Sequence, residues 1–194
     1  MRIIAGTFRG RVLASPRDRS VRPTTDRVKQ SIFDILATRV DFEALEVLDL
    51  FSGSGSLGLE ALSRGAATAT FVDTSHASLS LLEKNIQLLG LENRTAVHQA
   101  EVFWFLKNSR HPYGLVFVDP PFALERIGLL PTAIAHSGIL KPGAYVIMEH
   151  GKNSTVTVPE GSFELLQRTF GQTIVLIMKS AHQSESIEPS RSPK

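Results

Sequence analysis

From residue 45 onward, short apolar runs alternate with segments that have the spacing of amphipathic helices. This alternation restricts the possible folds more than any other feature of the chain, because it is typical of a mostly parallel sheet with helices on both faces. Strands are predicted at Leu45–Leu50, Thr68–Asp73, Arg94–Gln99, Tyr113–Val118 and Ala144–Glu149, and helices at Leu57–Arg64, Ser75–Leu89, Val102–Asn108 and Leu124–His136.

The two ends of the chain depart from this alternation. The last two predicted strands, Phe163–Phe170 and Thr173–Lys179, are separated by only two residues, which predicts an antiparallel hairpin. Residues 1–23 hold short apolar pieces between Gly, Pro and Arg, which favours a hairpin or an extended arm. A helix is predicted to start near Thr24, Thr25 or Asp26, with Lys29 off its apolar face. The polar residues 181–194 are predicted to be a disordered tail.

Composition excludes several classes of chemistry. The 194 residues include no Cys, which removes disulfides, thiolate zinc sites and Cys nucleophiles. The histidines lack metal-ligand spacing, so we expect no metal. No apolar run approaches the roughly 18 residues of a spanning helix, and no signal peptide is recognisable. We therefore expect a soluble cytoplasmic protein that binds no membrane.

Positive charge is concentrated at the amino-terminal end. Residues 1–39 carry nine basic and three acidic side chains, whereas the remainder carries twelve basic and sixteen acidic ones. Eight of the nine are Arg, which pairs with phosphate in bidentate fashion and stacks on bases. This asymmetry favours a nucleic-acid partner, although a solvated surface segment would have the same composition.

A glycine-rich turn follows the first predicted strand. Gly53, Gly55 and Gly58 satisfy G-x-G-x-x-G between a strand and a helix, and Asp73 ends the next strand, 20 residues after Gly53. The pattern fits NAD as well as S-adenosylmethionine. Asp49 favours the second cofactor, because a carboxylate there faces a cationic methionine group and would repel a pyrophosphate. The structural alternatives are a tight turn for the glycines and a helix cap for Asp73.

Asp119, Pro120, Pro121 and Phe122 close the most apolar strand. Two prolines fix φ and remove two backbone donors, so the loop presents acceptors beside a flat ring. Such a site fits a planar base that carries an amino group. The absence of Cys excludes methylation at pyrimidine C5, which needs a Cys nucleophile. The alternative is a turn in which Asp119 caps the next helix and Phe122 fills the core.

Together these features resemble a class I S-adenosylmethionine-dependent methyltransferase. The resemblance narrows to the RsmD family, whose members methylate N2 of a guanine in bacterial 16S ribosomal RNA. It is carried, over roughly residues 1–150, by Arg2–Gly6, Arg9–Arg11, Arg22–Val28, Leu48–Gly55 and Leu59–Ala66. It implies a Rossmann-like α/β fold: a seven-stranded, mostly parallel sheet with a carboxyl-terminal antiparallel hairpin. It also implies a basic RNA-binding extension over 1–39 and a methyltransferase domain over 40–180.

The resemblance also implies roles for individual residues. Asp49, Phe51, Ser52, Gly53 and Gly55 would line the cofactor, with Asp73 on its ribose and Glu101, where Asp is commoner, on the adenine amino group. Asp119, Pro120, Pro121 and Phe122 would form the catalytic loop, with Phe122 where Tyr is frequent. RNA would be bound by Arg9, Arg11, Arg22 and Arg27. The expected partner is 16S rRNA in the small ribosomal subunit particle, and the protein is expected to be a monomer.

Other functions stay open at this point. Adenine-N6 DNA methyltransferases and protein-glutamine methyltransferases use similar loops, a non-catalytic RNA-binding assembly factor would share the basic arm, and an NAD-dependent oxidoreductase would share the glycine turn. Trp104, between two Phe residues, is predicted to lie in the core, and the alternative is a stacking platform.

Overall fold

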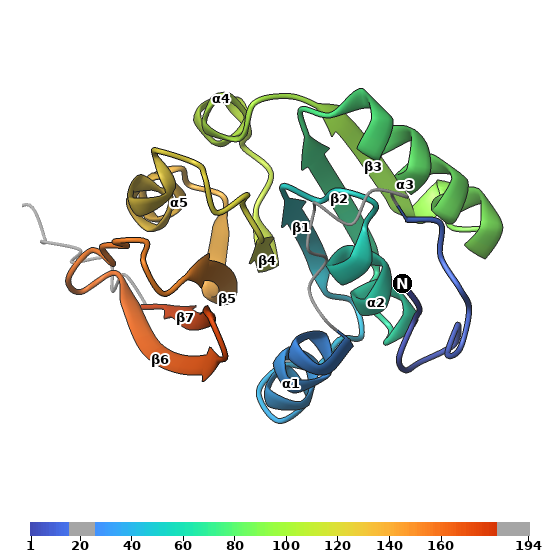
Figure 1. Cartoon of the computed structure of the whole chain (residues 1–194), viewed down its shortest axis with the longest axis horizontal. Helices are drawn as coiled ribbons and strands as arrows, with labels where there is room; N and C mark the ends of the chain where they lie inside the picture. Colours follow the sequence, from blue (N-terminus) through green and yellow to red (C-terminus); the bar gives the residue numbers. More distant parts are fainter. Residues whose placement is uncertain (16–25, 182–194) are drawn as a thin grey trace, which may run out of the picture.

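The computed structural model describes residues 1–15 and 26–181. Within them, seven strands form one sheet in the order β3-β2-β1-β4-β5-β7-β6 (Figure 1). Arg22, the proposed helix cap at Thr24 or Thr25 and the predicted disorder of 182–194 lie outside the described residues. The strands are β1 (Glu46–Leu50), β2 (Thr68–Asp73), β3 (Thr95–Gln99), β4 (Tyr113–Val118), β5 (Leu140–Gly151), β6 (Phe163–Phe170) and β7 (Thr173–Ser180).

The first five strands are parallel, and β7 pairs antiparallel with both β5 and β6. The predicted fold class is therefore confirmed, including the final hairpin. The strand order reverses between β1 and β4, which is the position where open α/β sheets bind ligands. Leu50 lies beside Val72 on one side and Val118 on the other, so the carboxyl ends of β1, β2 and β4 are level.

Five α-helices cover the two faces of the sheet (Figure 1). Alternate strand residues point to opposite faces, so neighbours such as Val47 and Leu48 enter different cores. One core includes residues of the first three helices, and the other includes residues of the last two. The helices are α1 (Asp26–Ala37), α2 (Ser56–Ser63), α3 (His76–Leu89), α4 (Val102–Asn108) and α5 (Leu130–His136), with short 3-10 turns at Glu92–Arg94 and Ile127–Leu129. None of the helices in the described residues is long and apolar enough to span a membrane.

Residues 1–15 form a hairpin rather than a free arm. Arg2 and Val12 make an antiparallel bridge, and the Ile3 amide donates to the Arg11 carbonyl at 3.0 Å. Ile3 and Leu13 are buried in the same core as α1, α2 and α3. The hairpin is therefore packed against the sheet domain. That residues 1–39 serve as an RNA-binding extension remains a proposal.

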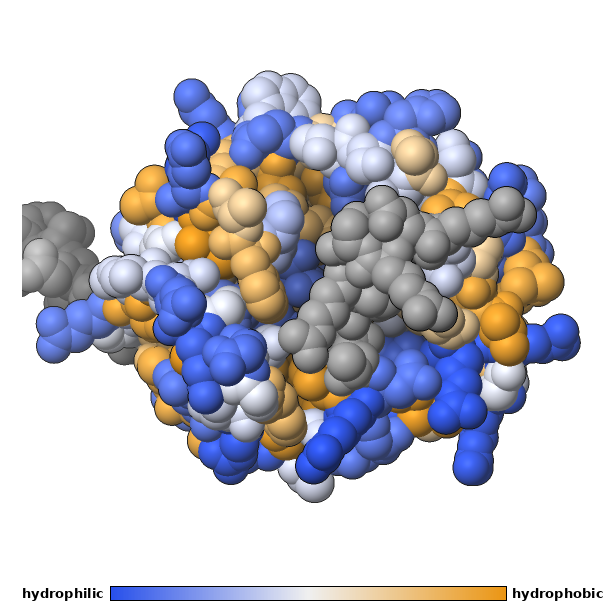
Figure 2. Space-filling view, viewed as in Figure 1, coloured by the Kyte–Doolittle hydropathy of each residue, from blue (hydrophilic) through white to orange (hydrophobic). Residues whose placement is uncertain are grey.

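Two side chains lie where the sequence pattern did not place them. Trp104, predicted to be core, is 61% exposed on α4, whereas the neighbouring Phe105 is buried. Lys29, predicted to lie off the apolar face of α1, is fully buried because Glu60 of α2 provides it with an ion-pair partner. Figure 2 shows hydrophobic and hydrophilic residues interspersed over the visible face.

Candidate cofactor and substrate site

The loops that follow β1, β2, β3 and β4 carry the residues singled out by the sequence, and they meet at one edge of the sheet. The parallel register places Leu50, Val72 and Val118 side by side, and Asp73 beside Gln99. The glycine turn, Asp73, Glu101 and the Asp119 loop therefore all follow the carboxyl ends of adjacent strands. This edge is where a ligand of such a sheet is expected.

The glycine turn is held closed by the next strand. The Gly53 amide donates to Asp73 Oδ2 at 2.8 Å, and the Gly55 amide donates to the Ser52 carbonyl at 2.8 Å. Gly55 has φ +86°, and a Cβ there would lie 2.4 Å from Leu82 Cδ1 of α3. A side chain is therefore excluded both by backbone conformation and by the packing of α3 against the turn.

Asp49 is buried beneath the glycine turn and is not exposed at the surface of the turn. It is only 2% exposed, and its Oδ2 accepts a hydrogen bond of 2.8 Å from the Gly58 amide in the first turn of α2. Burial raises the pKa of the Asp49 carboxyl well above its usual range, and the Gly58 hydrogen bond opposes this shift. The nearby Asp119 and Asp73 carboxylates raise that pKa further.

Three carboxylates from β1, β2 and β4 are thus close enough for their charges to interact. A cationic ligand at this edge would reduce the repulsion among Asp49, Asp73 and Asp119. An anionic pyrophosphate would increase it. The electrostatics of the edge therefore favour a positively charged ligand over a dinucleotide.

Two features of the turn itself fit a bound cofactor. The Ser52 hydroxyl is buried and has no hydrogen-bond partner among residues 1–15 and 26–181, although buried polar groups are usually paired. Phe51 has φ +57°, a conformation that costs roughly 1–3 kcal/mol for a residue other than glycine and that clusters at functional sites. A ligand that bonds to Ser52 would satisfy the hydroxyl and help to hold this backbone.

Glu101 caps a helix. Its Oε2 accepts a hydrogen bond of 2.8 Å from the Trp104 amide and so fixes the start of α4. Asp73 also has a structural role, because Oδ1 accepts from the Ser75 amide at 2.8 Å beside the cap of α3. A carboxylate has about four acceptor sites, so these bonds leave capacity for a ligand.

The Asp119 loop is neither a helix cap nor part of the core. Asp119 is partly exposed, and α5 begins only at Leu130 with no side-chain cap. The Pro121 carbonyl accepts from the Leu124 amide at 2.9 Å, which closes a turn around Phe122. The Phe122 ring is 48% exposed beside Gly151 at the end of β5. The alternative of a helix cap with Phe122 in the core is therefore wrong, and the loop exposes a flat ring three residues after an acid.

With this geometry in place, the chain can be compared with known proteins. A family described as "Conserved hypothetical protein 95" matches residues 1–179. The chain belongs to this family. It is 39% identical over 190 residues to ribosomal RNA small subunit methyltransferase D of Escherichia coli (strain K12), covering 96% of this chain and 93% of that protein. The Haemophilus influenzae protein of the same name is 35% identical over 174 residues, covering 88% of this chain and 89% of that one.

The fold of this family member also matches a solved structure. The yhhF protein of Escherichia coli superposes with a TM-score of 0.83 at 34% identity, covering 93% of this chain and 98% of that one. The family resemblance predicted from the sequence is thereby confirmed.

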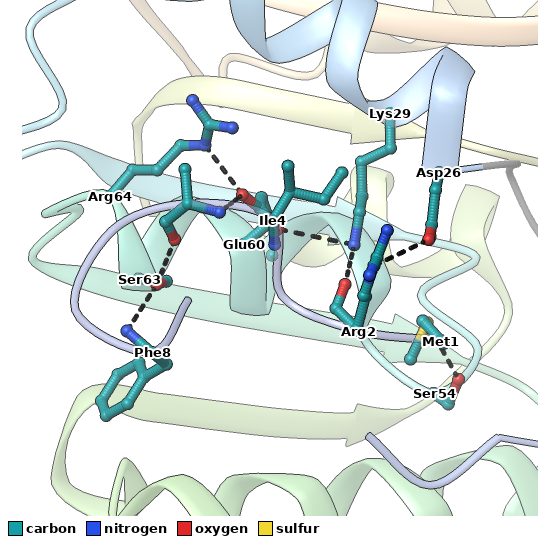
Figure 3. Close-up of polar contacts among 12 residues, drawn as sticks. Met1, Arg2, Ile4, Phe8, Asp26, Lys29, Ser54, Glu60, Ser63 and Arg64 are labelled. Atoms are coloured by element: carbon teal, nitrogen blue, oxygen red, sulfur yellow. Dashed lines mark hydrogen bonds and ion pairs between the residues drawn. The ribbon is translucent and has the colours of Figure 1, made fainter. Parts of the chain in front are cut away.

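The sequence analysis missed a buried polar network that fastens the hairpin of this family member to α2 (Figure 3). The Ile4 and Ala5 amides donate to the Glu60 carboxylate at 2.7 and 3.0 Å, and Arg64 and Lys29 flank it at 2.9 and 3.5 Å. An acid inside the otherwise apolar segment Leu57–Leu62, with Arg64 four positions later, was the available signal. The other partners could not be read from the sequence, since they lie 31 to 56 positions away.

Asn85 of α3 was missed as well. Its Oδ1 accepts from the Ala14 amide at 2.7 Å, and its Nδ2 donates to the carbonyls of Ala14 and Ser54, each at 3.0 Å. One buried side chain thus joins the end of the hairpin to the glycine turn.

The proposed RNA-binding arginines lie at separate places. Arg9 and Arg11 are exposed near the tip of the hairpin, where the Thr7 amide donates to the Ser63 carbonyl at the end of α2. Arg27 is exposed in the first turn of α1. The glycine turn precedes α2, and the hairpin tip contacts the end of this eight-residue helix. At ~1.5 Å per residue, α2 separates the two by about 12 Å.

Proposed function

We propose that this chain is an S-adenosylmethionine-dependent methyltransferase that methylates the exocyclic N2 of a guanine in 16S rRNA. The observation that carries the proposal is the meeting, at one sheet edge, of a glycine turn tied to Asp73 with an acceptor loop at Asp119 and Phe122. The 39% identity to the Escherichia coli methyltransferase over nearly the full chain supports the substrate class.

The cofactor would lie along the glycine turn. Asp73 would bind the ribose hydroxyls with the acceptor sites left by Gly53 and Ser75, and Glu101 would accept from the adenine amino group. Ser52, Gly53 and Gly55 would approach the methionine part through backbone and hydroxyl groups, with Phe51 beside them. Asp49 would act from behind the turn, through its negative field and its bond to Gly58. When bound, S-adenosylmethionine supplies an electrophilic methyl group on a sulfonium.

The catalytic loop would make the amino nitrogen a better nucleophile. Its lone pair is delocalised into the guanine ring, so Asp119 and the Pro120 carbonyl would accept its two hydrogens and favour a pyramidal nitrogen. Transfer of the methyl group to this nitrogen would displace the thioether, which would keep the electron pair, and would leave the nitrogen with one proton to lose. Asp119 then accepts the proton lost by the nitrogen. Holding the two reactants in line supplies much of the rate.

Phe122 would stack on the target base. The ring is exposed at the loop surface, and stacking of one base on an aromatic side chain is worth ~1–3 kcal/mol. The guanine must be unpaired or turned out of its helix to reach this loop. We further propose that a monomer acts in the cytoplasm on the assembling small subunit.

The proposal is tested by transfer of a tritiated methyl group to small-subunit particles, followed by digestion to nucleosides. Label is expected in N2-methylguanosine. Label in N6-methyladenosine or in protein glutamine would replace the proposed substrate with one of the alternatives. Calorimetric binding of NADH without binding of S-adenosylhomocysteine would refute the cofactor.

A further inference from the structure

A hollow of about 640 Å³ is lined by β2, β3 and α4. Its lining includes Thr68 and Thr70 of β2, His98 of β3, and Trp104 and Asn108 of α4. None of the four residues of the Asp119 loop lines it, so the hollow is separate from the loop that would hold the methylated base.

The indole of Trp104 is the most unusual part of this lining. It is 61% exposed, although Trp is among the side chains that bury the most apolar surface on average. The Trp104 amide donates to Glu101 and its carbonyl accepts from the Asn108 side chain at 2.8 Å, so the helix that carries the ring is well fixed. A rigidly placed, exposed indole beside a hollow provides a ready stacking surface.

The polar groups of the hollow suit a nucleotide. Arg94 is anchored by its bonds to the Ala66 and Ala67 carbonyls, and Arg110 by its bonds to the Lys107 and Ser109 carbonyls. A guanidinium has five donors, so both side chains are held in place with donors to spare. Asn93 and Asn108 add amide groups that can hydrogen-bond to a base edge.

One carboxylate lines the hollow, and its charge is offset. Glu46 forms an ion pair with Lys141, and His111 Nε2 lies 3.4 Å from the Glu46 carboxylate. The hydrogen bond from Lys141 lowers the pKa of Glu46, so this pair persists as an ion pair at neutral pH. The remaining charges on the lining are the two arginines, which favours an anionic ligand.

We propose that this hollow binds an unpaired nucleotide of the RNA substrate, with its base stacked on Trp104 and its phosphate beside Arg110. The inference rests on the proposed RNA substrate and adds a second contact, separate from the Asp119 loop that would hold the target guanine. Loss of such a contact weakens substrate binding and leaves the chemical step intact, so KM should rise while kcat stays unchanged.

Trp104 is the single Trp of the chain, so intrinsic Trp fluorescence reports on this side chain alone. The full-length protein is titrated with a mixed-sequence single-stranded oligoribonucleotide, and in parallel with an abasic oligonucleotide of the same length. Saturable quenching by the first and not by the second is expected, because only bases stack. Quenching by an acidic peptide but not by the RNA would overturn the proposal in favour of a protein partner.

Variants provide a second readout. Trp104→Ala is expected to raise KM for the particle roughly 5-fold or more, Trp104→Phe to restore most of the affinity, and Leu88→Ala, an exposed apolar residue of α3, to change nothing. An unchanged KM in Trp104→Ala, with normal methyl transfer, would refute the second contact and leave the proposed function standing. Base-dependent quenching in a protein that methylates no RNA would refute the function and leave the contact standing.

Discussion

Asn85 of α3 holds the glycine turn by donating a hydrogen bond of 3.0 Å from its side-chain amide to the Ser54 carbonyl. The same side chain makes two bonds to Ala14, so the hairpin and the turn share one support. We expect Asn85→Ala to weaken binding of S-adenosylhomocysteine and to lower stability by roughly 2–3 kcal/mol, because buried backbone groups lose their partners. Calorimetric titration and urea unfolding measure both effects. Gln87→Ala, on the exposed side of α3, serves as the control and should change neither.

Glu60 and Lys29 form a buried ion pair. Burial lowers the pKa of Lys29, while Glu60 and Asp26 oppose this shift. We expect Glu60→Gln to reduce the free energy of unfolding by roughly 3–5 kcal/mol, because it leaves the Lys29 ammonium without its carboxylate and one of the two hairpin amides facing an NH2 group in place of an acceptor. Adding Lys29→Met should recover part of the loss, and the exposed Glu83→Gln should be neutral in urea unfolding. A double variant no more stable than the single one would mean that the amide bonds, not the charge, dominate.

Asp49 gives stability a predictable pH dependence. Its folded pKa is raised above the unfolded value near 3.8, so between the two values the folded protein binds more protons than the unfolded chain. The free energy of unfolding therefore falls as pH rises through this window, and the deficit is complete above the folded pKa. Asp49→Asn keeps an acceptor for Gly58 but cannot ionise. Urea unfolding across a pH series should show that the free energy of unfolding of the variant increases relative to that of the parent protein as pH rises. Parallel plots of this free energy against pH would contradict the prediction.

Asp119 and Phe122 should separate catalysis from cofactor binding. We expect Asp119→Ala to reduce methyl transfer about 10²–10⁴-fold, as for removal of a proton acceptor that also positions the substrate. Affinity for S-adenosylhomocysteine should be unchanged, because the glycine turn is held by Asp73. Phe122→Leu should raise KM for RNA through lost stacking. If Asp119→Ala abolished cofactor binding too, its proposed role would be wrong.

Arg9 and Arg11 should contribute to RNA affinity through charge alone. We expect replacement of each by Gln to reduce the slope of log affinity against log salt concentration by about 0.7–1, the value for one lost phosphate contact. Filter binding of 16S RNA at several salt concentrations gives this slope. Arg168→Gln, exposed on β6, matches the charge change and should leave the slope unaltered.

Much of the fold could be predicted because the sequence pattern that indicates each strand or helix lies within that segment itself. The bounds of β2, α4 and β4 agree with the sequence pattern, and α3 ends at Leu89 as predicted. The position of the glycine turn, Asp73 and the Asp119 loop was predictable for the same reason, since each lies at or directly after the carboxyl end of a strand. These residues then come together because the strands that carry them are parallel and adjacent in the sheet.

What could not be predicted depends on contacts between distant segments. Lys29 is buried only because Glu60 faces it from another helix, and Asn85 matters only because Ala14 and Ser54 both reach it. In the sequence, Trp104 stands between Phe103 and Phe105, and such an apolar run is typical of the core. The burial of Val102, Phe105 and Leu106 leaves it on the outer side of a seven-residue helix.

The hairpin also affects how the chain folds while it is being synthesised. Ile4 bonds to a residue 56 positions later and Ala14 to one 71 positions later. At a synthesis rate of ~5–20 residues per second, the first fifteen residues wait roughly 4–14 s before Asn85 has even been added. During this interval Ile3 and Leu13 have no core to enter. Nascent chains of this protein should therefore expose an apolar amino-terminal segment to chaperones until α3 has emerged from the ribosome.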